Sequence, residues 1–310
     1  MTAAAEPKRR PSVTVHDVAR LAGVSAMTVS RAVNTPERIP AATLAKVQAA
    51  IAKTGYVPNL MAGGLRSSKS RLVAALVPTL AGPVFNETVQ ALTAALNAQG
   101  YQLLLGQTGY ADSHEDDLVG AIIGRRPDGV VLTGVTHSAD TRQRLLAAGI
   151  PVVETWDLTP TPIDMVVGFS HAAVAEAVCR RLHAAGRRRL GVIGADDERA
   201  RRRSLAFVAA ARSLGLAEPL VHEVPAPTTL GSGRGGLRAL LARQPEVDAL
   251  FCSSDLLALG VYTEAQALAI AIPARLAVIG FGDLDFAKDM HPALTTVRID
   301  GSRIGSEAAR

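Results

Sequence analysis

Two hydrophobic periodicities divide the chain. Before residue 58, apolar residues recur three to four positions apart, which is typical of helices that bury one face. After Arg71, short apolar runs alternate with helical stretches, which is typical of parallel strands joined by helices. The pattern therefore predicts a small all-α module followed by a larger α/β body.

The stretch from Thr14 to Asn34 predicts two short helices joined by a tight turn. Thr14 followed by Asp17 is a capping-box start, Ser25 offers a second N-cap, and Gly23 supplies the turn. At about 100° per residue the second helix has an apolar arc and an opposite, partly polar arc. These arcs hold Thr28, Val29, Ala32 and Val33 on one side and Met27, Ser30, Arg31 and Asn34 on the other.

This arrangement is that of a helix-turn-helix, whose second helix enters the major groove of DNA. An ordinary helical hairpin would give the same short pattern, but the charge favours DNA. Residues 1 to 71 carry eleven Lys and Arg against three acids, a net of +8 within a chain of net +5, so the remainder sums to −3. Basic character confined to the motif-bearing segment is typical of a phosphate-binding module.

The same pattern predicts the bounds of the small module, which we call the head, and of the segments on either side of it. Residues 1–12, basic and rich in proline, are expected to be a disordered leader. A third helix with Leu44, Val47 and Ile51 on one face, ending at Gly55, completes a DNA-binding domain over 13–57. Residues 58–70 are expected to be a hinge or linker, because each of two adjacent glycines disfavours a helix by about 1 kcal/mol.

The body over 71–310 has ten candidate strands, which fit two sheets better than one. These are 72–77, 102–105, 129–132, 152–154, 165–168, 190–193, 220–224, 249–252, 277–280 and 296–299, with helices expected at 84–98, 115–124, 172–185 and 256–267. Ligands of such folds bind at the carboxyl ends of the strands, between lobes.

Other features narrow the class of protein. The N-terminus lacks the apolar segment of a signal peptide, and no apolar run approaches the ~18 residues of a membrane span, so a cytoplasmic protein is expected. Cys179 and Cys252 lie among apolar neighbours, which favours buried free thiols over a disulfide or metal site.

Two sequence motifs suggest cofactor or metal sites but lack the required context. Gly231, Gly233 and Gly236 form a GxGxxG that does not directly follow a strand, so no dinucleotide cofactor is expected. The acidic run 114–117 fits the first turn of a helix better than a metal site. Hydrolase, metalloprotease and nucleotide-binding signatures do not occur, so the sequence does not favour an enzyme.

Four segments resemble the LacI/GalR family of bacterial transcriptional regulators: VTVHDVARLAGVSAMTVSRAVN, TGYVPNLMAGGLRS, IGFGDLDFA and PALTTVRID. Within the family, VFNETVQAL, GYQLLLGQTGY, GIPVVE and GADDERA are most similar to the gluconate-type repressors. The resemblance implies a periplasmic-binding-protein-like body of two parallel-sheet lobes. Lobe 1 would cover about 71–168 and 287–300, and lobe 2 about 170–283.

The resemblance also implies a homodimer that reads a pseudo-palindromic operator in double-stranded DNA. Leu65 matches the leucine that the family wedges into the minor groove, although Gly63 and Gly64 depart from the hinge pattern. A flexible linker without DNA contact is the alternative. The expected DNA-contacting residues are Thr14, Ser25, Ala26, Met27, Thr28, Ser30, Arg31, Asn34, Tyr56, Asn59 and Leu65.

For the effector, the resemblance implies a small carbohydrate, with gluconate or another sugar acid as the best match. Asp255 and Arg199 match the family's effector-binding aspartate and arginine. Phe85, at the first strand-helix turn, is placed either to stack on the ligand or to pack in the core. Asp255 also suits a helix N-cap, whereas Arg201, Arg202 and Arg203 are expected to be solvated. The full expected set is Phe85, Thr133, His137, Glu154, Arg199 and Asp255.

Two alternatives stay open at this point. Family members usually continue for a few tens of residues beyond Arg310, so the C-terminus is apparently truncated, either in nature or because the sequence is a fragment. A cytoplasmic sugar-binding module without functional DNA binding is the alternative function, although the intact helix-turn-helix residues argue against it.

Overall fold

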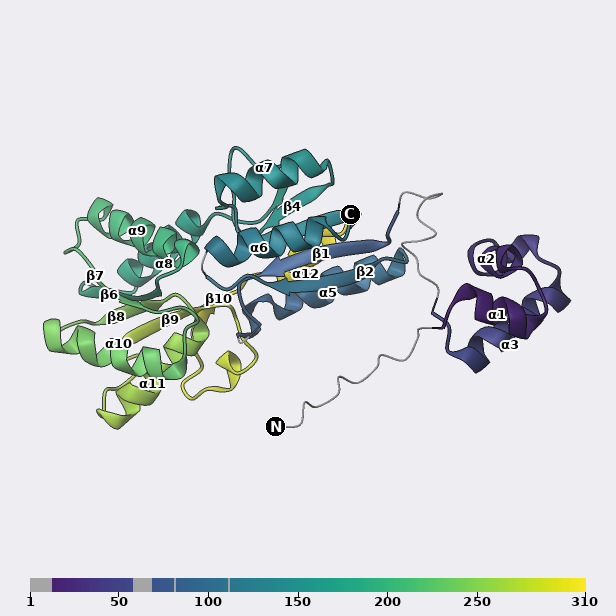
Figure 1. Cartoon of the computed structure of the whole chain (residues 1–310). Helices are drawn as coiled ribbons and strands as arrows, with labels where there is room; N and C mark the ends of the chain where they lie inside the picture. The colour runs from purple at the N-terminus through teal and green to yellow at the C-terminus, as the bar shows by residue number, and fades with distance from the viewer. Residues whose placement is uncertain (1–12, 58–68, 81, 111) are drawn as a thin grey trace, which may run out of the picture. The chain divides into compact units, whose positions relative to one another are not determined.

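A computed structural model of the chain describes residues 13–57, 69–80, 82–110 and 112–310. The chain divides into a small unit that ends at Ser70 and a larger unit from Arg71 to Arg310 (Figure 1). Within the described ranges no helix is long and apolar enough to cross a membrane.

The small unit is a three-helix domain. It consists of α1 (Val15–Ala22), α2 (Ala26–Asn34), the 3-10 helix η1 (Pro36–Arg38) and α3 (Ala41–Thr54). Val18, Val29 and Val47, one from each α-helix, are fully buried at its centre. The expected capping box is present, since the backbone N–H of Thr14 donates to Asp17 Oδ2 at 3.0 Å. Gly23 ends α1 in the left-handed conformation that a non-glycine residue rarely adopts.

The first lobe of the large unit has a five-stranded parallel sheet in the order β2-β1-β3-β4-β5. Its strands are β1 (Leu72–Val77), β2 (Gln102–Gln107), β3 (Gly129–Thr133), β4 (Val152–Thr155) and β5 (Met165–Val167). One face packs against α6 (Asp112–Ile123) and α7 (Ala139–Ala148). The other face packs against α5 (Asn86–Ala98), which the 3-10 helix η2 (Pro83–Phe85) precedes, and α12 (Gly301–Ala308).

The second lobe repeats this plan with the strand order β10-β9-β8-β6-β7. Its strands are β6 (Leu190–Ala195), β7 (Leu220–Val224), β8 (Ala249–Cys252), β9 (Ala277–Phe281) and β10 (Thr295–Val297). One face packs against α8 (His171–Ala184) and α9 (Glu198–Ser213). The other packs against α10 (Leu230–Arg243) and α11 (Asp255–Ala267), with the 3-10 helix η3 (Ala287–Asp289) beside them.

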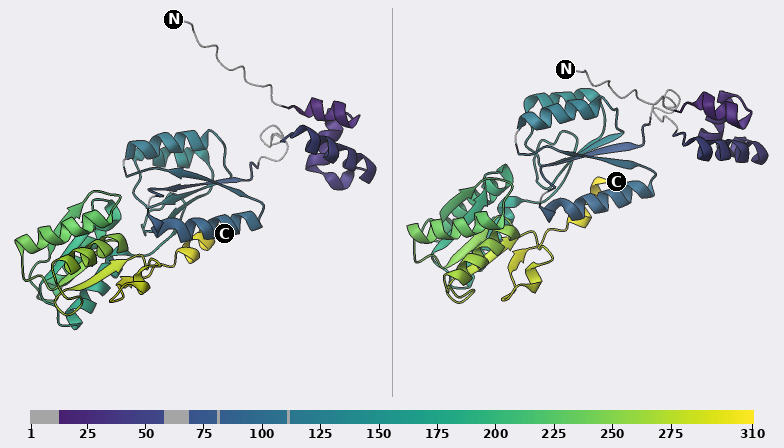
Figure 2. Two further views of the ribbon diagram at one scale, coloured as in Figure 1. Left: turned by 90° about the horizontal axis from the view of Figure 1, so that it is seen from below. Right: turned by 60° about the horizontal axis from the view of Figure 1, so that its bottom comes forward.

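The chain crosses between the lobes twice within the described residues. The first crossing lies between β5 and α8, around Phe169 as expected. The second differs from the expected division, which placed 287–300 in the first lobe. Leu294 packs in the core of the second lobe and β10 pairs with β9, so the chain returns only after Val297. Figure 2 shows the returned segment, α12, lying along α5.

Candidate functional site

The expected DNA-contacting face of the small unit lies on α2, whose two sides separate as the periodicity predicts. Val29 and Ala32 are buried, whereas Met27 is 55% exposed and Ser30, Arg31 and Asn34 are also exposed. The Ser25 hydroxyl accepts a hydrogen bond from the backbone N–H of Thr28 at 3.1 Å and so fixes the start of the helix. An exposed face with an apolar side chain and a guanidinium suits contact with base edges.

The other expected DNA contacts occupy varied positions. Thr14 and Ser25 precede the first turns of α1 and α2, and Ala26 and Thr28 are half-buried. Tyr56 is half-buried against the head core. Asn59 and Leu65 lie outside the described residues.

A cavity of about 90 Å³ lies between the two lobes of the body. We call it the inner cavity. Its walls include buried aromatic residues: Phe85 and Trp156 meet edge to face with ring centroids 4.9 Å apart, and Phe281 stands on the side of the second lobe. Ile304 of α12 packs behind Phe85 and Trp156, so the returned C-terminal helix supports this wall. Trp156 adopts φ 69°, a conformation that costs energy in a non-glycine residue and is often kept at functional sites.

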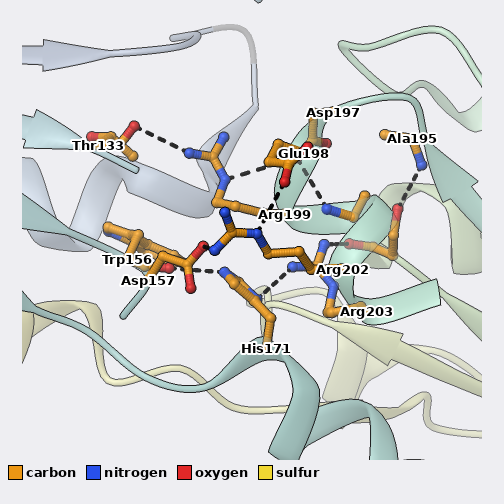
Figure 3. Close-up of polar contacts among 12 residues, drawn as sticks. Thr133, Trp156, Asp157, His171, Ala195, Asp197, Glu198, Arg199, Arg202 and Arg203 are labelled. Carbon is orange, nitrogen blue, oxygen red and sulfur yellow. Dashed lines mark hydrogen bonds and ion pairs between the residues drawn. The ribbon is translucent and has the colours of Figure 1, made fainter. Parts of the chain in front are cut away.

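Arg203 is the central charge of the inner cavity (Figure 3). It is 5% exposed, and its guanidinium lies 4.1 Å from the ring centroid of Phe281. Its Nη2 donates to the Ser253 carbonyl at 3.2 Å, and its Nη1 lies 2.9 Å from His171 Nδ1. Because a guanidinium only donates, His171 Nδ1 must accept, and its Nε2–H therefore donates to the Trp156 carbonyl at 2.9 Å.

The charge states at this centre follow from burial. Burial and the neighbouring arginines lower the pKa of His171 to about 3, so the imidazole is neutral at pH 7. Burial lowers the pKa of Arg203 to about 10, which still leaves it charged at neutral pH. Arg203 has no carboxylate within ion-pair distance among the described residues, and its buried Nε lacks a hydrogen-bond partner there. A buried cation of this kind favours an anionic ligand.

Arg199 lies one turn before Arg203 on α9 and also lines the inner cavity. Its Nη1 donates to the Thr133 carbonyl of the first lobe at 3.2 Å, and its guanidinium carbon lies 5.5 Å from the centroid of the Phe85 ring. Three of the expected effector residues, Phe85, Thr133 and Arg199, are thus brought together. The Asp197 carboxylate stands 3.8 Å from Arg199 Nε.

A second cavity of about 460 Å³ adjoins the first, and we call it the outer cavity. The two share Tyr110, Asp197, Arg199 and Ala226 in their walls. Among its described lining residues, acids outnumber arginines: Glu115, Asp157, Asp196, Asp197 and Glu198 against Arg199 and Arg201. The cleft between the lobes is therefore basic at its buried end and acidic at its open end.

The remaining expected effector residues lie elsewhere in the body. The side chain of His137 is 3% exposed and sits between Glu115, 2.6 Å from Nδ1, and Glu154, 3.4 Å from Nε2. Burial lowers the pKa of His137, but its hydrogen bond to Glu115 and the nearby carboxylate of Glu154 outweigh burial and raise the pKa to about 9. Asp255 is fully buried, accepts from Thr296 Oγ1 at 2.6 Å and from the Leu284 amide at 2.8 Å, and follows the N-cap Ser254. None of these three side chains is among the described linings of the two cavities.

The expectation that Arg203 is solvated is wrong, and the sequence contained a signal against it. Ala200 precedes Arg203 by three positions and Phe207 follows it by four, and both are buried. The helical period thus places Arg203 on the buried face of α9. Arg201 is half-exposed and paired with Glu223, whereas Arg202 reaches Asp157 of the first lobe at 2.9 Å.

Comparison with known proteins identifies both units. Residues 14–59 match the model of bacterial regulatory proteins of the lacI family, and residues 179–310 match a periplasmic binding protein-like domain. The HTH-type transcriptional regulator GntR of Pseudomonas aeruginosa is 38% identical over 96% of this chain and 87% of its own length. GntR of Escherichia coli is 33% identical over 97% and 91%.

A solved structure has the same architecture. The crystal structure of a LacI family transcriptional regulator from Silicibacter pomeroyi superposes with a TM-score of 0.90 at 34% identity, covering 96% of this chain and 90% of that one. The chain therefore belongs to the LacI family of bacterial regulatory proteins and is a DNA-binding transcriptional regulator rather than an enzyme.

Proposed function

We propose that this regulator is a homodimeric repressor whose affinity for DNA is controlled by a small sugar acid, with gluconate as the best match. The observation that carries the effector class is Arg203, a buried guanidinium in the wall of the inner cavity without a carboxylate partner in the described chain. Arg199 adds a second guanidinium. Two such forks suit a carboxylate, which accepts bidentate hydrogen bonds.

The proposed binding mode uses the shape of the two cavities. The inner cavity, at about 90 Å³, is much smaller than the outer cavity, at about 460 Å³. It fits a carboxylate and the carbon beside it, so the hydroxylated chain of a sugar acid extends past Tyr110 into the outer cavity. There the acidic side chains accept hydrogen bonds from hydroxyl groups. In this proposal the effector does not contact Glu154, His137 or Asp255. These residues hold the residues of the cavity walls in place.

On DNA, Met27 and Arg31 of α2 make the base contacts, Met27 through an apolar contact and Arg31 through guanine. Two heads of a dimer would read the two halves of a pseudo-palindrome. Effector binding between the lobes changes their orientation and thereby the operator affinity, with a typical coupling of 1–3 kcal/mol.

The test is fluorescence anisotropy of the full chain on a pseudo-palindromic duplex with a central CG step and on a scrambled duplex. We expect preference for the palindrome, and a weaker complex with gluconate but not with glucose, which lacks the carboxylate. Arg31→Ala should lower the preference for the palindrome more than it lowers scrambled-duplex binding, whereas Lys53→Ala, an equal loss of charge on exposed α3, should lower both alike.

Two cavity variants complete the experiment. Arg203→Met and Arg199→Gln should each keep palindrome binding and lose most of the response to gluconate, and circular dichroism shows whether each variant folds. Equal responses to gluconate and glucose would exclude the sugar-acid effector. Binding of gluconate without any palindrome preference would favour a sugar-binding module whose head does not act on DNA.

A further inference from the structure

The two cavities differ in charge, and this difference affects which group the ligand can place in the outer cavity. The inner cavity contains Arg199 and Arg203 with Asp197 as its one described acid. The described lining of the outer cavity holds more carboxylates than guanidinium groups. An extended ligand that spans both cavities thus meets positive charge at one end and negative charge at the other.

Most of the acids in the outer cavity contact a nearby cation. Glu115 pairs with His137, which is protonated at neutral pH because its pKa is raised to about 9. Asp157 and Glu198 both contact Arg202, at 2.9 Å and 3.1 Å. These contacts reduce the negative charge that Glu115, Asp157 and Glu198 present to the cavity.

Asp196 is the exception. Its carboxylate accepts a hydrogen bond from the backbone N–H of Ala226 at 2.8 Å, which fixes it at the carboxyl end of β6. Among the described residues no Lys, Arg or His lies within ion-pair distance of it. It is exposed and lines the outer cavity, so its charge faces the space that the tail of a ligand would occupy.

We propose that Asp196 is a specificity-determining residue that restricts the effector to molecules with a single anionic group. The carboxylate occupies the inner cavity beside Arg203, and the other end must be an uncharged, hydroxylated chain. A phosphate or second carboxylate there meets the unpaired charge of Asp196 and is rejected by like-charge repulsion. This inference rests on the proposed sugar-acid effector and deepens it.

Asp196→Asn is a conservative test, because the amide oxygen of asparagine can still accept from Ala226 while the charge is removed. Asp289→Asn is the matched control, since Asp289 is an exposed acid in the same lobe outside both cavity linings. Isothermal titration calorimetry of the full chain would measure the affinities of gluconate, 6-phosphogluconate and glucarate for each protein.

We expect the wild-type protein to bind gluconate about tenfold or more tightly than either doubly charged acid. Asp196→Asn should reduce that ratio severalfold, mainly by tightening the binding of 6-phosphogluconate and glucarate, and Asp289→Asn should leave it unchanged. Higher salt should also reduce the wild-type ratio, because ions screen the charge of an exposed carboxylate.

Two results would overturn the inference in different ways. Equal wild-type affinities for the three acids, or a ratio that Asp196→Asn leaves unchanged, would remove the role of Asp196 while keeping the sugar-acid effector. Failure of all three acids to bind the folded protein would reject the proposed effector itself, and the inference with it.

Discussion

At the scale of the residue, the contact chain from Trp156 through His171 to Arg203 makes the body sensitive to acid. His171 is neutral in the folded protein, since its pKa is lowered to about 3, against about 6.5 when unfolded. Between these values the unfolded chain binds a proton that the folded chain does not, so the free energy of unfolding falls as the pH falls below about 6.5.

We therefore expect the urea midpoint of the wild-type protein to drop from pH 7 to pH 5, followed through Trp156, the only tryptophan in the chain. His171→Gln should show a smaller drop, because glutamine keeps one donor and one acceptor and does not titrate. His291→Gln, a change at an exposed histidine of the same lobe, serves as the control. Equal drops in the wild-type and His171→Gln proteins would contradict this interpretation.

Single residues were the part of the site hardest to predict from sequence. The helical period locates Arg203, but only the fold reveals that its partner is a histidine 32 positions earlier. Likewise Asp255 follows the end of a strand and suits a ligand, yet its carboxylate accepts hydrogen bonds from Thr296 and Leu284. Contacts between residues distant in sequence leave no periodic pattern, so these roles become visible only in three dimensions.

At the scale of the element, the literal GxGxxG has a structural explanation within α10. Gly233 lies where α10 crosses α11, and a Cβ there would collide with the backbone carbonyl of Leu257 and lie 3.0 Å from Gly260 Cα. Gly233 and Gly260 thus permit a close approach of the two helices, whereas Gly236 faces the Ile193 side chain of the sheet. They belong to the packing of the second lobe.

Gly233→Ala should destabilise the body by about 1–3 kcal/mol, the usual cost of overpacking, because the obstructing atoms are backbone and cannot rotate away. Gly235→Ala changes the same helix two positions on, where a Cβ meets nothing within 4 Å. It should stabilise the body by about 0.5–1 kcal/mol through helix propensity. Urea denaturation would compare the two, and equal destabilisation by both would refute the crossing as the cause.

Elements themselves were largely predictable, because each strand of the body is a short apolar run between helical stretches. The ends of β1, β7 and β8 coincide with the predicted ends, whereas β10 begins at Thr295, one residue earlier than expected. Which sheet β10 joins was not predictable, since its three residues fit the edge of either lobe. Pairing with β9 and burial of Leu294 decide the matter.

At the scale of the whole molecule, the first turns of α9 connect the two lobes of the body. Arg202 extends from α9 to the first lobe, where it donates to Asp157 at 2.9 Å (Figure 3). It also donates to Thr136 Oγ1 at 3.1 Å. Asp157 is buried, so this contact is better protected from solvent than an ordinary surface pair. Arg201, the preceding residue, pairs with Glu223 of the same lobe instead.

Arg202 therefore helps to fix the orientation of the lobes. Lobe orientation is the property through which an effector would act on DNA binding. Arg202→Gln removes the ion pair with Asp157 that connects the lobes. The lobes should then change their orientation more readily without the effector. We expect the ratio of operator affinities without and with gluconate to shrink severalfold, out of a range of about 5–150-fold that is typical of such coupling. Arg201→Gln makes the same chemical change one residue away and breaks a contact within one lobe, so its ratio should stay at the wild-type value.

Anisotropy titrations on the palindromic duplex measure both ratios, and calorimetry confirms that each variant still binds gluconate. If the two variants changed the ratio alike, loss of positive charge near the cavity would explain the effect, and the contact between Arg202 and Asp157 would have no part in the coupling.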